Sequence, residues 1–468
     1  MAWGGNDGAI DRWEKQLKEN DPKLVSLHIL SFRKVSTKEL VRLFAAMAGN
    51  TVLRDLYISG HALDEACADQ LSEVLTLNDT LRTLNLGNAT LGHDAKVFGL
   101  FCEGLAVNEG LIKLDLDNKG LKNDTVRLLA EALGKNEHLK EINLTRNELD
   151  DEAMEVLASA CTTLEKINLS MNQIGPKGVM ALAKDLMPHG AVQELDLSDN
   201  PLLDGASQFV DALRQNTTLH VLKMVDVVSS GLDALATLPP PASEASSSDR
   251  KLTEEKEDQA QGGERSVHGN ALLLALGSVL ETNRHLTHVW LNNNSIESSA
   301  LETLATHLSA SSLIELTLRN NLIDDQGALA LSQSITRLRQ LELGENNITA
   351  TGFGALLDTS SLHYLGLFGN KVGGFGDAIL PELKQSSIKR LDIGCNSIVH
   401  KDIEAMVDVL LKQGAPDLEI LELGGNVEDK EVELWENTLS RLLSERELEI
   451  IWKRKPSQMG DVPPPPAV

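Results

Sequence analysis

One short pattern of apolar residues recurs along most of this chain of 468 residues. In its clearest form Leu139, Ile142, Leu144 and Leu149 follow one another, with Asn147 before the last leucine. Copies that keep the asparagine begin at Leu139, Leu164, Val192, Leu286, Leu313, Leu338, Leu362, Ile388 and Leu418. With one exception, neighbouring copies start about 24 to 30 residues apart, the size of one supersecondary unit. Because one copy cannot bury its own apolar side, such a chain must stack its copies into an elongated array.

Looser copies complete the array. They begin at Leu24, Leu53, Leu81, Leu111 and Leu219, and Leu448 and Ile451 indicate a frayed final copy. Ala89, Lys119 and Val227 stand where three of these copies would carry the asparagine. Together with the regular copies they make about 14 to 15 repeats.

The first half of each repeat predicts a short β-strand, because apolar residues two positions apart point to the same side of an extended chain. The asparagine follows the strand, where its amide can bond backbone groups left over at the turn. The second half predicts a helix: within residues 124–133, one face is shared by Leu128, Leu129, Ala132 and Leu133. We therefore expect an α/β solenoid with a parallel sheet on its concave side and helices on its convex side.

In these residues the chain resembles the ribonuclease-inhibitor-like class of leucine-rich-repeat proteins. The resemblance covers about residues 20 to 450 and implies a horseshoe with strands inside and helices outside. The class includes inhibitors, the repeat domains of NOD-like receptors, actin-filament regulators and the Ran GTPase-activating protein. Ribonuclease inhibitor itself is rich in cysteine, whereas this chain has four cysteines, so it departs from that protein.

One stretch interrupts the array. Between Leu219 and Leu286 the chain carries about 40 residues more than one repeat needs. Residues 238–266 are rich in Pro, Ser and charged residues, which predicts a disordered acidic insert. It is either a regulatory or partner-binding loop with phosphorylatable Ser243 and Ser246–Ser248, or a tolerated surface insertion.

The remaining boundaries follow from the insert and from the two ends. Residues 1–22 predict an N-terminal capping helix around Trp13 and Leu17, and residues 427–455 predict a C-terminal cap around Trp435. The repeats between them fall into two halves, 23–237 and 267–426. Residues 456–468 predict a disordered Pro-rich tail, for which a polyproline ligand is the alternative.

Charge and cysteine content restrict the partners and the compartment. The net charge of −26 disfavours nucleic acid and anionic membranes, which would repel the chain. No signal peptide or membrane-spanning stretch is evident, and the cysteines show no paired spacing. These features predict a cytoplasmic or nuclear protein that is not secreted.

The sequence offers no catalytic motif. A phosphate loop, a nucleophile elbow and a zinc-protease motif are all missing. His285 and His288 are the nearest approach to a metal pair, but two ligands do not make a site, and in the repeat register His288 alone clearly faces the inner surface. We expect no enzyme activity, no cofactor and no metal.

Two patches on the concave side are the candidate binding sites, because residues between the apolar strand positions face that side. The first patch is acidic with interleaved asparagines and suits a basic surface; it consists of Asp115, Asp117, Glu141, Asn143, Asn168, Glu194 and Asp196. The second patch carries aromatic anchors and consists of His288, Trp290, Arg319, Glu342, Tyr364, Phe368, Arg390 and Asp392. The alternative is that the acids are merely solvated and the aromatic rings pack on neighbouring strands.

A non-enzymatic scaffold that binds another protein on the concave face is therefore the expected function. The resemblance to the Ran GTPase-activating protein implies an alternative, a regulator of a small GTPase, although this chain lacks that family's acidic segment after the repeats. Actin-filament regulation would require further amphipathic helices. The resemblance also implies a monomer.

Overall fold

The computed structural model describes residues 8–229 and 249–452 of the chain. These residues form two compact units. Unit 1 contains the described residues up to Lys223, together with Ser229. Unit 2 contains Met224–Val228 and the described residues from Asp249 onward.

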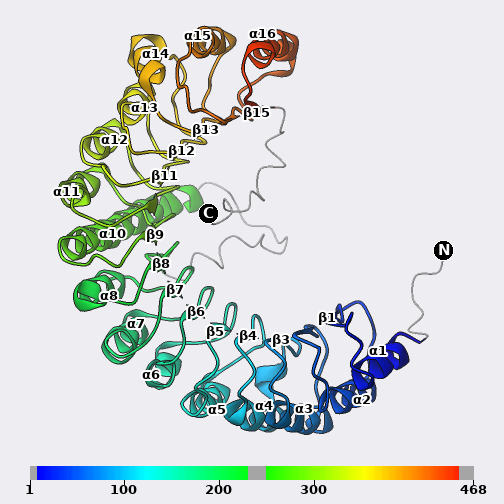
Figure 1. Ribbon diagram of the computed structural model, residues 1–468. Helices are drawn as coiled ribbons and strands as arrows, with labels where there is room; N and C mark the ends of the chain where they lie inside the picture. The colour runs from blue at the N-terminus through cyan, green and yellow to red at the C-terminus, as the bar shows by residue number, and fades with distance from the viewer. Residues whose placement is uncertain (1–7, 230–248, 453–468) are drawn as a thin grey trace. The chain divides into compact units, whose positions relative to one another are not determined.

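Unit 1 alternates short strands with helices. Its strands pair in parallel and in chain order: β1 Ser26–His28, β2 Asp55–Tyr57, β3 Thr83–Asn85, β4 Lys113–Asp115, β5 Glu141–Asn143, β6 Lys166–Asn168, β7 Glu194–Asp196 and β8 Val221–Lys223. Its α-helices are α1 Ala9–Lys18, α2 Thr37–Met47, α3 Glu65–Leu77, α4 Ala95–Val107, α5 Asn123–Leu133, α6 Asp151–Ala160, α7 Pro176–Ala181 and α8 Gly205–Ala212. Shorter helical turns are η1 Leu91–His93, η2 Leu182–Leu186 and η3 Leu213–Gln215. In Figure 1 the strands line one side of this unit and the helices the other.

Unit 2 repeats the design. Its parallel strands are β9 His288–Trp290, β10 Glu315–Thr317, β11 Gln340–Glu342, β12 Tyr364–Gly366, β13 Arg390–Asp392, β14 Ile420–Glu422 and β15 Glu449–Ile451. Its helices are α10 Asp249–Leu280, α11 Ser298–Leu308, α12 Asp325–Ser332, α13 Ala350–Leu357, α14 Gly376–Gln385, α15 His400–Leu411, the turn η4 Asp429–Glu431 and α16 Val432–Glu445. The predicted α/β leucine-rich-repeat solenoid, with strands on one side and helices on the other, is confirmed in each unit.

The core lies between the strand layer and the helix layer. The middle residue of almost every strand is fully buried, as Leu114, Ile142 and Leu195 are, while its two neighbours are partly or fully exposed. This alternation follows from the period of two along a strand. The side chains of the first and third strand residues therefore form the face opposite the helices, which we call the strand face.

The turn position of most repeats is occupied by a buried asparagine that joins adjacent repeats. Asn147 donates from Nδ2 to the carbonyls of Leu116 at 3.0 Å and Leu144 at 2.9 Å, and its Oδ1 accepts from the amides of Lys119 and Leu121. These are backbone groups that the strand ladder has left unpaired, as the sequence pattern predicted. His61 takes the same position in the second repeat, with Nε2 3.2 Å from the carbonyl of Ile29.

A second row of asparagines was not predicted. Asn78, Asn108 and Asn136 lie just after the helices of unit 1. Each donates from Nδ2 to carbonyls of the preceding repeat and accepts at Oδ1 from backbone amides two and three residues further on. Their regular place before the strand was visible in the sequence. It was overlooked because isolated asparagines at helix ends also serve as simple stop signals.

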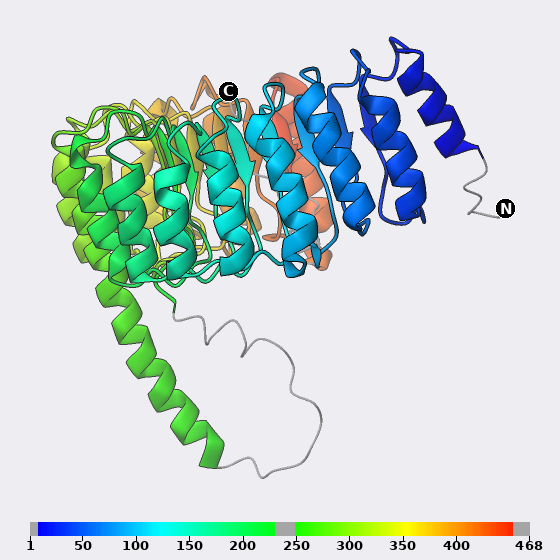
Figure 2. The same ribbon diagram turned by 90° about the horizontal axis from the view of Figure 1, so that it is seen from below.

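The structure differs from the expected insert at 238–266. Residues 238–248, which include Ser243 and Ser246–Ser248, lie outside the described residues, but residues 249–266 are helical and belong to α10. Figure 2 shows α10 continuing well past the other helices of its unit. The charged segment is rich in Glu, Lys and Gln, which have high helix propensity. A segment with few apolar residues has little to bury in a core, but it can still form a helix. The predicted disorder therefore does not hold for residues 249–266.

Helices cover both ends of the helix layer. Helix α1 buries Ile10, Trp13 and Leu17 on its neighbour α2, and α16 buries Trp435, Leu439 and Leu442 beside α15.

Within the described ranges, no helix combines the length and apolar character needed to cross a membrane.

Candidate functional site: two patches on the strand face

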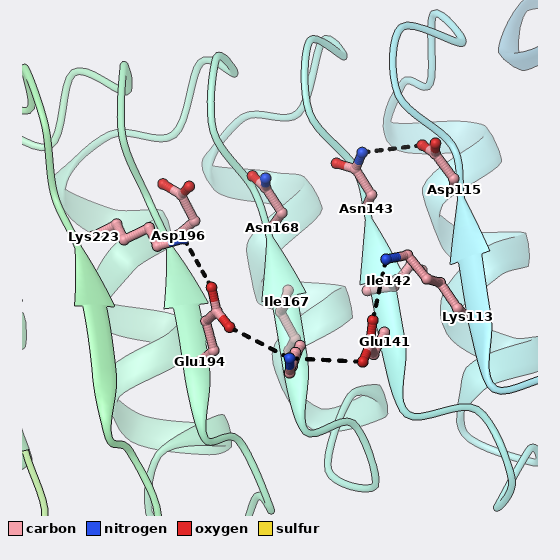
Figure 3. A pocket seen from close by; sticks show the side chains of 11 residues that line it. Lys113, Asp115, Glu141, Ile142, Asn143, Ile167, Asn168, Glu194, Asp196 and Lys223 are labelled. Atoms are coloured by element: carbon pink, nitrogen blue, oxygen red, sulfur yellow. Dashed lines mark hydrogen bonds and ion pairs between the residues drawn. The ribbon is translucent and has the colours of Figure 1, made fainter. Parts of the chain in front are cut away.

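The first patch lies across four neighbouring strands of unit 1. The parallel register places Glu141 and Glu194 in one row with Lys113 and Lys166, and places Asp115, Asn143, Asn168 and Asp196 in a second row. Six of the seven predicted residues of this patch line one shallow hollow of about 350 Å³ (Figure 3). The seventh, Asp117, lies just beyond its strand and forms a two-point contact with Arg146 at 2.9 and 2.6 Å.

Lysines alternate with the acids of the first patch. Lys113 lies 3.4 Å from Glu141, and Lys166 lies 3.8 Å from Glu141 and 3.7 Å from Glu194. Lys223, which stands in register with Asp196 in the second row, reaches across to Glu194 at 2.8 Å (Figure 3). Burial alone would raise the pKa of Glu194, but the contacts with Lys223 and Lys166 bring it below its usual value. The surface is therefore of mixed charge rather than uniformly acidic.

Sequence reasoning missed these lysines as site residues, although the repeat register held the signal. Lys113 and Lys166 occupy the same strand position as Glu141 and Glu194. They were overlooked because long cationic side chains on a strand face are commonly just solvated.

Amides hold the second row of the first patch. Asp115 accepts from the side-chain amides of Asn85 at 2.6 Å and Asn143 at 3.0 Å. Asn168 accepts from the hydroxyl of Ser170, and Asp196 accepts from the backbone amide of Ser198 at 3.0 Å. The row is thus oriented by local hydrogen bonds and presents polar atoms to the open side of the sheet.

The second patch lies on β9 to β13 of unit 2, and its aromatic rings are partly exposed. Trp290 donates from Nε1 to Glu315 at 2.7 Å. Tyr364 donates its hydroxyl proton to Glu342 at 2.6 Å, and burial raises the pKa of that phenol. A carboxylate on the adjacent strand therefore fixes the rings of Trp290 and Tyr364, and both side chains stay partly exposed.

Two arginines cover the remaining aromatic faces. The guanidinium carbon of Arg319 lies 5.1 Å from the ring centre of Phe368, and that of Arg390 lies 5.3 Å from the ring centre of Tyr364. Arg319 is held by Glu345 at 2.6 Å, and Arg390 is held by Glu422 at 2.9 and 2.6 Å. The ion pairs therefore hold each arginine over its aromatic ring in the unbound protein. Glu315 and Glu345 are further site residues that the sequence reasoning did not name, and Glu422 was expected on the concave side but not assigned to the patch.

Glycines make room for this arrangement. A side chain at Gly366 would collide with the Glu342 carboxylate, and one at Gly394 would press on the ring of Phe368. The glycines therefore leave space for the side chains of Glu342 and Phe368 beside the next repeat. Glycine at these positions is explained by close approach rather than by backbone conformation.

Asp392 lies on β13, the last strand of the second patch. Burial raises its pKa to about 7, and the nearby carboxylates of Glu422 and Glu342 add to the effect, whereas the Gly394 amide and Arg319 oppose it. Its Oδ1 accepts from the Gly394 amide at 2.9 Å. Asp392 is thus an acid whose charge depends on pH in the neutral range.

His288, the remaining predicted residue, lies at the edge of the second patch, where Nδ1 is 2.8 Å from the hydroxyl of Thr287. Among the residues that the structure describes, no three His, Cys, Asp or Glu side chains gather as a metal site would require.

Comparison with known proteins gives a consistent picture. A family model described as a leucine-rich repeat matches residues 135–158 and 160–183. Ribonuclease inhibitor of Mus musculus is 29% identical over 355 residues, which are 72% of this chain and 75% of that protein. Ribonuclease inhibitor of Sus scrofa is 29% identical over 340 residues, 69% of this chain and 71% of that protein.

Among solved structures, a chain of the yeast Rad7–Elc1 complex aligns over 95% of this chain and 92% of its own length. It is 16% identical with a TM-score of 0.41, too distant to support a conclusion. The repeat pattern and the alternation of strand and helix in both units show a leucine-rich-repeat protein, and the two inhibitors make it similar to ribonuclease inhibitors.

Proposed function

We propose that this chain is a non-enzymatic interaction scaffold that binds another protein on its strand face. The similarity to ribonuclease inhibitor supports a protein-interaction scaffold in general. One observation carries the proposal for this face: ordered polar and aromatic side chains stand in register on it, and the helices lie on the opposite side.

The second patch would supply most of the binding energy. Tryptophan, tyrosine and arginine dominate the energetics of protein interfaces. Here Trp290, Tyr364 and Arg390 are already fixed by carboxylates and by stacking, so a partner would meet them with little further loss of side-chain entropy.

The first patch would select the partner. Its alternating lysines and acids favour a surface that also carries both signs, because like charges placed opposite one another are costly. This modifies the expectation of a simply basic partner. Individual exposed ion pairs contribute little affinity, so the patch acts on orientation and specificity.

Protection of lysines tests the proposal. The tagged full chain is used to capture partners from a lysate, with a purified ribonuclease as the first defined probe because the relatives are ribonuclease inhibitors. Bound and free chains are then treated with an acylating reagent, and each lysine is quantified by mass spectrometry. We expect Lys113 and Lys166, which are 53% and 52% exposed, to become protected.

Lys184 is the matched control, because it is 82% exposed and lies on the helix side in η2. Its modification should not change upon binding. Protection of Lys184 without protection of Lys113 and Lys166 would place the partner on the helices and overturn the proposal.

A further inference from the structure

Both end strands of the described chain have an open edge. Along a strand, backbone groups alternate between the two sides. In β1 the carbonyl of Val25 accepts from the amides of Arg54 and Asp55, and the amide of Ile29 donates to Tyr57. Residues 25, 27 and 29 therefore face β2, and the N–H and C=O groups of Ser26 and His28 point to the other side.

Within the described residues no strand lies on that other side of β1. Ser26 and His28 stand in register with Asp55 and Tyr57, which use the same backbone groups to bond the preceding strand. Strand β15 shows the opposite edge. Glu449 and Ile451 bond back to β14, so the backbone of Ile450 points away from it. Helices α1 and α16 cover the ends of the helix layer, but neither strand edge has a partner strand in the described part of the chain.

The edge at β1 is also apolar, unlike the same positions in the next repeat. Val25, Leu30 and Phe32 are 45%, 51% and 72% exposed. The positions equivalent to Val25 and Leu30 in the second repeat are Arg54 and Ser59. Terminal repeats of solenoid proteins normally carry a polar outer face, so an exposed apolar rim marks a contact surface.

The two ends carry opposite charge. Residues 8–36, which contain α1 and β1, have six basic and four acidic side chains, a net charge of +2. Residues 428–455, which contain α16 and β15 and the basic residues Lys453, Arg454 and Lys455, have six basic and eight acidic side chains, a net charge of −2. In a chain with a total charge of −26, a positively charged end is unusual, and it complements the far end.

We propose that the β1 edge of one copy pairs with the β15 edge of a second copy, head to tail. The strands would be parallel and in the register of the internal repeats, with Leu27 beside Ile450. The amides of Ser26 and His28 would then donate to the carbonyls of Leu448 and Ile450, and the amide of Ile450 would donate to the carbonyl of Ser26. The contact continues the sheet and leaves the strand face open, so it is separate from the binding proposed above.

Proline variants of the two edges test this pairing. Ser26→Pro and Ile450→Pro each remove an outward N–H group, which proline cannot supply. Sedimentation velocity or mass photometry is carried out on the full chain between about 1 and 200 μM, a range that detects weak association. The mean mass of the wild type should rise with concentration, while each variant alone should keep the mass of one chain.

Mixing the two variants gives the decisive result. A Ser26→Pro copy keeps its β15 edge and an Ile450→Pro copy keeps its β1 edge, so an equimolar mixture should form a species of two chains and nothing larger. A wild type whose mass does not change with concentration overturns the proposal. So does loss of association in Ser26→Pro with full association in Ile450→Pro, because that pattern belongs to a two-fold contact between β1 edges.

Charge variants keep the test valid if a proline variant fails to fold. Phe32→Glu places an acid at the β1 end, and Glu449→Lys places a base at the β15 end. Both positions are exposed. Each should weaken association by on the order of tenfold or more, and an equimolar mixture should associate again, because it brings the intact β15 end of one variant against the intact β1 end of the other. Leu77→Glu is the matched control, since Leu77 is 63% exposed on α3, and it should leave association unchanged.

Discussion

The side-chain amide of Asn321 donates a 3.1 Å hydrogen bond to the carbonyl of Leu291, one repeat earlier in the chain. It also donates to the carbonyl of Leu318 at 2.9 Å, and its Oδ1 accepts from the amides of Asn294 at 3.1 Å and Ile296 at 3.0 Å. One buried side chain therefore satisfies backbone groups of two repeats at the turn where the strand ladder ends.

Asn321→Ala should destabilise the fold by about 2 to 4 kcal/mol, because it leaves several buried backbone groups without partners. Urea unfolding followed by circular dichroism measures the loss. Asn437→Ala on α16 is the control: Asn437 is exposed, and its replacement should change the free energy of unfolding by less than about 0.5 kcal/mol. Equal stability of the two variants would contradict the role given to the turn asparagine.

Asp392 should make stability depend on pH. Its pKa is about 7 in the folded chain against an ordinary value of 3.8, so the folded state holds a proton that the unfolded state releases between these values. The contribution of Asp392 to stability therefore falls as pH rises from about 4 to 7 and is constant above that range.

Asp392→Asn removes this dependence and keeps an acceptor for the Gly394 amide. Relative to the wild type, the variant should be more stable by roughly 4 kcal/mol at pH 8, with the advantage vanishing near pH 4. Urea unfolding at both pH values gives the comparison. A difference that is the same at pH 4 and pH 8 would mean that Asp392 does not titrate in this window.

The sequence predicted the strand layer well because burial of one residue in two is a strong constraint. Leu114 and Ile142 could face only the core, which set the register of Asp115 and Asn143 beside them. The turn asparagine was equally predictable, because a single side chain has to satisfy fixed backbone groups there.

Contacts within the site were harder to predict, because they depend on side-chain conformation. Nothing in the spacing of Arg319 and Phe368 indicates that they stack, since the contact spans two strands and needs the small residues Gly344 and Gly394 around it. The mixed charge of the first patch was predictable, because the register places Lys113 and Lys166 in the same row as the acids. The prediction named the acids of that row and left out the lysines. Residues 238–266 were expected to be disordered because they can bury little surface, but the residues of high helix propensity from 249 onward form part of α10.

The cysteines should react in two classes. Burial raises the pKa of Cys67 and of Cys161 to about 12 and raises that of Cys102 still further, so their thiolates are scarce at neutral pH. Cys395 is partly exposed, and burial raises its pKa more modestly. With iodoacetamide at pH 7.5, slow labelling of Cys395 is expected in the native chain and labelling of the other three only in urea. Native labelling of Cys102 ahead of Cys395 would contradict this burial pattern.

Trp290 should be the largest single contributor to partner binding on the second patch. Trp290→Ala removes a ring that Glu315 holds in a fixed orientation, so we expect an affinity loss of about 2 kcal/mol, or roughly 30-fold in Kd. Isothermal titration calorimetry with the captured partner measures the loss, and a thermal melt checks that folding is little changed. Leu329→Ala is the matched control, since Leu329 is 49% exposed on α12, and it should bind like the wild type. Unchanged affinity in Trp290→Ala would remove the second patch from the interface.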